Sequence, residues 1–123
     1  MVVKENLIKN FKECLEGARS EELQKRYRNA IELYYKAVVA LCDILIFEKE
    51  GNIPDYHKQR DMLLEELNGD VNKIRIGLHT IYRQSYYKSD FGLSDMKEMK
   101  NAIKTIVALK RPSKDIEELV KKL

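Results

Sequence analysis

The chain has 123 residues, of which 35% are charged and 44% hydrophobic, with only five Gly and two Pro. This length fits one compact domain over residues 1–123 and excludes a multidomain enzyme. The net charge of +3 identifies no partner by itself, but residues 1–70 carry 11 basic and 14 acidic side chains, whereas residues 71–123 carry 12 and 6.

The first charged residues, Lys4 and Glu5, come too early for the apolar segment of a secretory signal to precede them. The sequence therefore predicts that the protein has no secretory signal and is cytoplasmic. The longest mostly apolar stretch, Ala37–Phe47, is about half of the ~20 residues that a membrane-spanning helix needs. Cys14 and Cys42 are 28 residues apart, and neither has a second cysteine at the C-x-x-C spacing of metal sites and redox pairs. We therefore expect two buried thiols and no metal or cofactor. Few Gln with many Lys, Glu and Ile are typical of a thermophile.

Apolar residues recur three and four positions apart almost throughout, which predicts an all-α, up-and-down bundle of about five helices plus a short tail helix. The first helix is expected over residues 3–16, with Gly17 as its C-cap. Ser20 is expected to cap a long central helix of roughly 30 residues that runs to about Glu50. Its second half is apolar on several faces, so we expect a second copy of the chain to cover part of it in a homodimer.

The remaining helices are expected to be joined by short connections, which favour antiparallel neighbours. Asp55, Asp70 and Ser94 are the predicted caps of the third, fourth and fifth helices. Asn68-Gly69 should end the third helix and the turn at Ser89-Asp90-Phe91-Gly92 the fourth. A short amphipathic helix is predicted over residues 113–123.

The fourth predicted helix has no acidic residue after Asp70, its predicted cap. Basic and aromatic side chains are interleaved along it. Helical spacing places Arg75, His79, Tyr82 and Tyr86 on one stripe, with Arg83 four residues after His79. Cations neutralise phosphates and aromatic rings stack on bases, so these five residues are candidates for binding a nucleotide or nucleic acid. Alternatively, the tyrosines belong to the core or an interface, and the cations pair with the acidic first half.

A histidine beside a cation is also a workable pair for RNA cleavage, which makes His79 with Arg75 or Lys73 a catalytic candidate. The alternative for His79 is a surface imidazole bonded to a neighbour, and His57 is expected to bond locally at the start of the third helix. Asp43 lies in the apolar half of the central helix and needs a cationic partner. We expect that partner from the fourth helix, in a structural ion pair rather than an active-site wall.

Three segments resemble the HEPN family, the nucleotide-binding domain of higher eukaryotes and prokaryotes. Residues 30–41, with the Tyr34-Tyr35 pair, are similar to the family's long second helix. Pro54-Asp-Tyr-His57 resembles the Pro and His before its third helix, and residues 87–92 resemble the Ala-Asp-Tyr ending of its fourth. The resemblance covers about residues 20–110.

The resemblance implies a helical bundle that dimerises through its long helices and has one of two roles. Some members are metal-independent ribonucleases of toxin–antitoxin systems, with an Arg and a His separated by four to six residues. Others lack that pair and accompany a nucleotidyltransferase. Here only three residues separate Arg75 from His79. Lys73 has the family's spacing, with five residues between it and His79, but a lysine has no guanidinium group to hold a phosphate through two hydrogen bonds. We therefore place the non-catalytic role first, the ribonuclease second and a purely structural helical interaction protein third.

Overall fold

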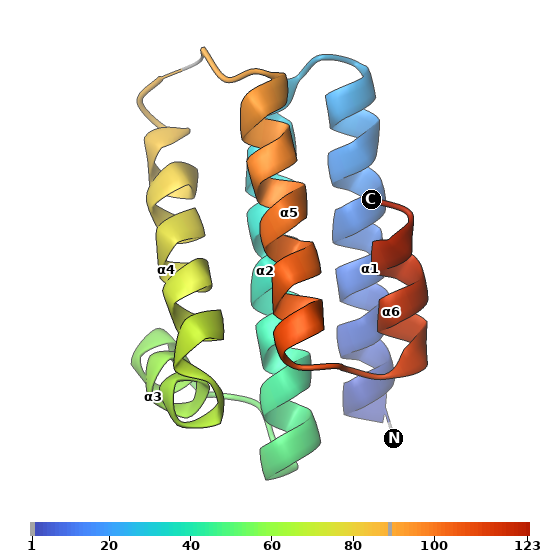
Figure 1. The fold of residues 1–123 in the computed structure, drawn as a ribbon, viewed down its shortest axis with the longest axis vertical. Helices are drawn as coiled ribbons and strands as arrows, with labels where there is room; N and C mark the ends of the chain where they lie inside the picture. The colour runs from blue at the N-terminus through green and yellow to red at the C-terminus, as the bar shows by residue number, and fades with distance from the viewer. Residues whose placement is uncertain (1, 89) are drawn as a thin grey trace.

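The computed structural model describes residues 2–88 and 90–123, apart from the side chain of Val2, and every regular element in those residues is a helix (Figure 1). The helices are α1 (Val2–Leu23), α2 (Tyr27–Glu50), α3 (His57–Leu67), α4 (Gly69–Gln84), α5 (Leu93–Leu109) and α6 (Lys114–Lys121). The expected all-α bundle is confirmed, with six helices in this part of the chain. None of these helices is long and apolar enough to cross a membrane.

Helix α2 is the centre of the bundle, because it packs against α1, α3, α4 and α5. In Figure 1, α5 lies in front of α2, α1 and α4 stand on its two sides, and α6 packs on α5. The apolar half of α2 is largely covered within one chain, since Val38, Leu41, Ile44 and Ile46 are all fully buried. The apolarity of α2 therefore does not require a second subunit, which removes the sequence-based argument for a homodimer.

The boundary between the first two helices differs from the prediction. Helix α1 continues through Gly17 and Ser20 as far as Leu23, so these residues are neither the C-cap nor the N-cap that we expected. Gly17 has a packing role instead: a Cβ atom there would lie 3.2 Å from Cδ1 of Leu33 in α2, so the glycine permits the two helices to approach closely. The chain turns at Lys25, whose φ is 62°. Helix α2 is consequently shorter than expected, with 24 residues.

The caps of the later helices were also misplaced. Asn68 caps α4 in place of Asp70, because its Oδ1 accepts hydrogen bonds from the backbone N–H groups of Asp70 and Val71 at 3.0 and 3.2 Å. The N-cap of α3 is Tyr56 rather than Asp55. The N-cap of α5 is Gly92 rather than Ser94.

The end of α4 lies earlier than expected. The helix ends at Gln84, ahead of the turn predicted at residues 89–92, of which Ser89 lies outside the described residues. Tyr86 therefore follows α4 rather than belonging to it, although it stays next to the last turn through a backbone hydrogen bond from its N–H to the carbonyl of Arg83 at 3.2 Å.

Candidate functional site

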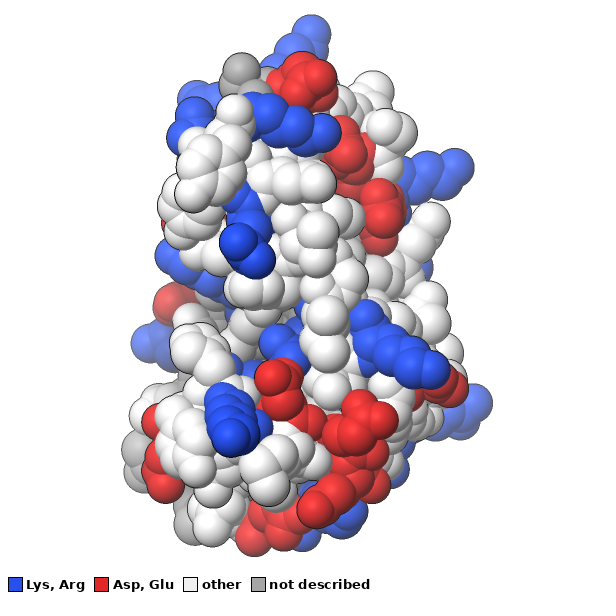
Figure 2. All heavy atoms as spheres, turned by 90° about the vertical axis from the view of Figure 1, so that its left-hand side faces the viewer, with Lys and Arg blue, Asp and Glu red and all other residues white. Residues whose placement is uncertain are grey.

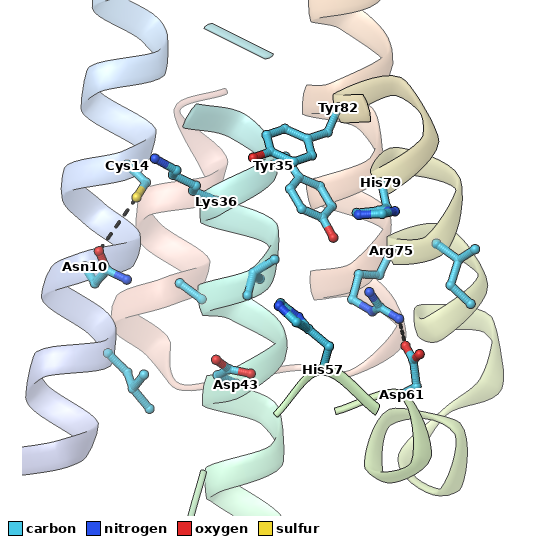
Figure 3. Close-up of a pocket in the computed structure, with 14 residues that line it drawn as sticks. Asn10, Cys14, Tyr35, Lys36, Asp43, His57, Asp61, Arg75, His79 and Tyr82 are labelled. Carbon is cyan, nitrogen blue, oxygen red and sulfur yellow. Dashed lines mark hydrogen bonds and ion pairs between the residues drawn. The ribbon is translucent and has the colours of Figure 1, made fainter. Parts of the chain in front are cut away.

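A cleft of about 790 Å³ opens on the side of α2 that faces away from α5 (Figure 3). Helix α2 forms its floor, α1 and α4 form its walls, and the start of α3 closes one end. Its volume lies in the range of small-molecule sites. The lining residues are Leu7, Asn10, Cys14, Tyr35, Lys36, Val39, Ala40, Asp43, His57, Asp61, Arg75, Ile76, His79 and Tyr82.

Four side chains, here called the aromatic cluster, lie together on one side of the cleft. Tyr35, His79 and Tyr82 line it, and Tyr86 packs edge-on against Tyr82. The rings of Tyr35 and Tyr82 are stacked, with centroids 4.7 Å apart and planes inclined by 18°. The His79 ring lies 5.5 Å from that of Tyr35 and 6.1 Å from that of Tyr82. The hydroxyls of Tyr82 and Tyr86 are hydrogen-bonded at 2.7 Å. The predicted stripe thus brings three of its residues together, and the structure adds Tyr35, which sequence reasoning missed.

Arg75 does not lie on an exposed stripe as predicted. Its side chain is buried, its guanidinium forms an ion pair with Asp61 of α3, and it donates to Oδ1 of Asn72 at 3.1 and 3.3 Å. The two acceptors compete with any phosphate for its N–H groups. Arg75 lines the cleft, but its charge is already compensated.

The other predicted cations of α4 do not line the cleft. Lys73 and Arg83 are exposed and are not among the residues that line it. Arg83 instead lines a smaller hollow with Thr80, Gln84 and Tyr87. Figure 2 shows the face that carries α3 and α4: basic side chains are spread along it, whereas the largest group of acidic side chains lies at its lower end, near α3.

Asp43 has a cationic partner, but from α3 rather than from α4 as expected. The guanidinium of Arg60 donates through Nε to Oδ1 at 2.7 Å and through Nη2 to Oδ2 at 3.1 Å. Both side chains are mostly buried, with exposed fractions of 14% for Asp43 and 13% for Arg60. This planar two-bond geometry compensates a charge that would otherwise be costly in the apolar half of α2. Arg60 also places Nη1 3.0 Å from Nδ1 of His57, so His57 bonds locally, as expected.

The three members of the aromatic cluster that line the cleft have shifted pKa values that favour their uncharged forms. Burial, helped by the positive charges of Arg83 and Arg75, lowers the pKa of His79, which favours the neutral imidazole. Burial raises the pKa of Tyr35, although the charge of Arg75 acts in the opposite direction. The hydrogen bond to Tyr86 raises the pKa of Tyr82 to about 12. The wall is thus a neutral stacking surface with polar ring atoms.

The two thiols carry no reactive character. Burial raises the pKa of Cys14 and raises that of Cys42 to about 12, so both stay protonated at neutral pH. Within residues 2–88 and 90–123, no group of three or more His, Cys, Asp or Glu side chains is placed to hold a metal ion.

The residues that sequence reasoning missed are Tyr35, Lys36, His57 as a cleft residue, Arg60 and Asp61. The first two could have been found from helical spacing, because Tyr35, Val39 and Asp43 recur at intervals of four along α2, and Lys36 precedes Ala40 and Asp43 by four and seven residues. The α3 residues carry no such signal, since their position depends on how α3 folds back over α2 and α4. Comparison of the chain with protein-family models, curated proteins and solved structures finds no match.

Proposed function

We propose that this chain is a nucleotide-binding module of the HEPN type, which takes up one base of a nucleotide or of single-stranded RNA in the cleft on α2. One observation carries the proposal: neutral rings of His79 and Tyr82, supported from below by Tyr35, form a wall of a cleft of about 790 Å³. Stacking of a base on an aromatic side chain contributes about 1–3 kcal/mol and needs no particular base sequence.

The charges around the cleft favour an anionic ligand only mildly. Asp43 is compensated by Arg60 and Asp61 by Arg75, so neither carboxylate presents an uncompensated charge. Lys36 of α2 lines the cleft on the side of α1, where its ammonium lies 3.5 Å from Glu32. This distribution suits a ligand with one or two phosphates better than a long polyanion, whose affinity grows with the number of phosphates neutralised.

Binding takes precedence over RNA cleavage because of Arg75. A ribonuclease of the suggested kind needs a guanidinium that is free to hold the scissile phosphate, and that of Arg75 is buried against Asp61 and Asn72. Lys73 does not line the cleft that contains His79. Incubation of the protein with total RNA in EDTA tests the alternative: cleavage that disappears in His79→Ala would establish it.

We include in the proposal the homodimer and a nucleotidyltransferase partner that the family resemblance implies. Exposed apolar side chains on α4 and just after it support an interface, since Ile76 and Tyr86 have exposed fractions of 48% and 58%. Sedimentation equilibrium tests the dimer: a monomer at concentrations up to 0.1 mM, taken as about a hundred times a micromolar dissociation constant, would exclude it.

Titration with AMP and with a fluorescently labelled RNA oligonucleotide at low and moderate salt tests the binding function. Wild-type protein should bind, Tyr82→Ala should weaken binding by about 1–3 kcal/mol, and Tyr82→Phe should retain it because the stacking surface remains. Tyr87→Ala is the matched control, because this tyrosine is strongly exposed and does not line the cleft. Absence of binding by the wild type to both probes at low salt would overturn the proposal.

A further inference from the structure

His57 enters the cleft from a different helix than the aromatic cluster. It is the first residue of α3, and its ring points up into the space between α2 and α4 (Figure 3). The ring lines the cleft, and it is close enough to His79 to contribute to lowering the pKa of that residue. The base-stacking function described above assigns no task to His57.

The orientation of this imidazole is set by a chain of hydrogen bonds that begins on α2. Asp43 accepts from one edge of the Arg60 guanidinium, through Nε at 2.7 Å and Nη2 at 3.1 Å. The remaining nitrogen, Nη1, lies 3.0 Å from Nδ1 of His57. The side chains of Asp43 and Arg60 are mostly buried, so the guanidinium is confined to one plane.

This chain also determines where the imidazole proton resides. Every guanidinium nitrogen is a donor and none is an acceptor, so Nδ1 of His57 must accept the hydrogen bond from Arg60. In the neutral ring the single proton is then on Nε2. The Nε2–H group of His57 is consequently a hydrogen-bond donor. It lies at the end of the cleft where Asp43 and Asp61 each form an ion pair with an arginine.

We propose that His57 is a ligand-binding residue of the cleft, that its Nε2–H donates to an acceptor atom of the bound nucleotide, and that Arg60 and Asp43 are its positioning residues. The inference rests on the proposed function and assigns a polar contact with the ligand at the end of the cleft that α3 closes. The acceptor is either a phosphoryl oxygen or an atom of the nucleoside, since both accept from an imidazole N–H.

The tautomer can be tested on the free protein, independently of any ligand. Long-range ¹H–¹⁵N correlation spectra of the imidazole should show His57 protonated at Nε2 and unprotonated at Nδ1 in the wild type. Arg60→Lys keeps a cation beside Asp43 but removes the planar guanidinium that contacts both Asp43 and His57. The spectra of this variant should therefore show a mixture of His57 tautomers. A proton on Nδ1 in the neutral wild-type ring would overturn the positioning chain.

The binding role is tested by titrating AMP and adenosine into four proteins. His57→Ala should weaken binding by about 2- to 10-fold, the effect of one hydrogen bond, and His57→Gln, whose amide N–H can take the place of Nε2–H, should restore it. Lys58→Ala, an exposed neighbour that does not line the cleft, should behave like the wild type. Loss for AMP alone identifies a phosphoryl acceptor, and loss for both probes identifies the nucleoside.

The two proposals fail in different ways. If the wild type binds neither AMP nor the RNA oligonucleotide, the nucleotide-binding function is wrong, and the role of His57 in it is wrong as well. If the wild type binds and His57→Ala binds equally well, the function stands and the assignment of His57 is overturned.

Discussion

Tyr82 of α4 is stacked on Tyr35 of α2, with ring centroids 4.7 Å apart. This contact joins the two helices directly at the cleft. Because Tyr35 is buried and Tyr82 is only half-buried, one face of the wall is packed into the bundle while its edge reaches the cleft. A wall that is held in this way is organised before a ligand arrives, which lowers the entropy lost on binding.

The first prediction concerns the phenol of Tyr82. Its folded-state pKa of about 12 is above the ordinary value of about 10, so its contribution to stability is present below pH ~10 and is lost as pH rises through the folded-state value. Tyr86→Phe removes the hydrogen-bond partner of the Tyr82 hydroxyl and should shift the ionisation of Tyr82 to lower pH. Ultraviolet titration of the phenols measures this shift, and an unchanged titration curve would contradict it.

The second prediction concerns the charge of the aromatic cluster. Arg83→Ala removes a cation that lowers the pKa of His79, so that pKa should rise toward the ordinary histidine value. NMR titration of the imidazole protons measures it. Lys104→Ala on the exposed surface of α5 removes the same charge elsewhere and should leave His79 almost unchanged. A pKa shift of equal size in both variants would show that net charge, rather than the neighbouring arginine, is responsible.

The third prediction compares two glycines inside helices. Gly77→Ala should stabilise the protein by about 0.5–1 kcal/mol, because the new Cβ would meet no side chain and no other helix within 4 Å, and alanine is the better helix former. Gly17→Ala should gain little, because its Cβ would meet Leu33 at 3.2 Å. Gly17→Leu should destabilise by about 1–3 kcal/mol through overpacking between α1 and α2. Urea denaturation measures all three, and a stabilising Gly17→Leu would contradict the packing role of this glycine.

The fourth prediction concerns the ion pair between α2 and α3. Arg60→Met leaves the Asp43 carboxylate mostly buried without its partner, and the free energy of unfolding should fall by about 2 kcal/mol, less than for a fully buried pair. Adding Asp43→Asn should recover part of this loss, because the uncompensated charge is removed. Lys58→Met changes an exposed neighbour in the same helix and should have little effect on the unfolding midpoint.

Local pattern predicted the helical architecture and the part of the site that lies within one helix. The end of α2 is an example, because Gly51 adopts the left-handed conformation, with φ of 81°, at the predicted break. The grouping of His79 and Tyr82 follows from helical spacing, whereas Tyr86 stays beside Tyr82 although it lies past the end of α4. Gly17 misled the prediction, since a glycine that permits close packing of two helices resembles one that ends a helix.

The rest of the site depends on contacts between helices, which periodicity does not encode. Asp43 pairs with Arg60 and Arg75 pairs with Asp61 only because α3 folds back across the end of α2 and beside α4. A single sequence shows that Asp43 needs a cation but does not distinguish between the basic residues of α3 and those of α4. The stacking of Tyr35 on Tyr82 is hidden for the same reason, since it requires the relative register of two helices.

Mapping AMP binding by NMR tests the central claim most directly. Addition of AMP to isotopically labelled protein should shift the ring signals of Tyr82 and His79 and give intermolecular NOEs between the adenine protons and these rings. Signals of the exposed surface of α6 should not move. Saturable shifts confined to residues away from the cleft, or no shifts at millimolar AMP, would contradict the account.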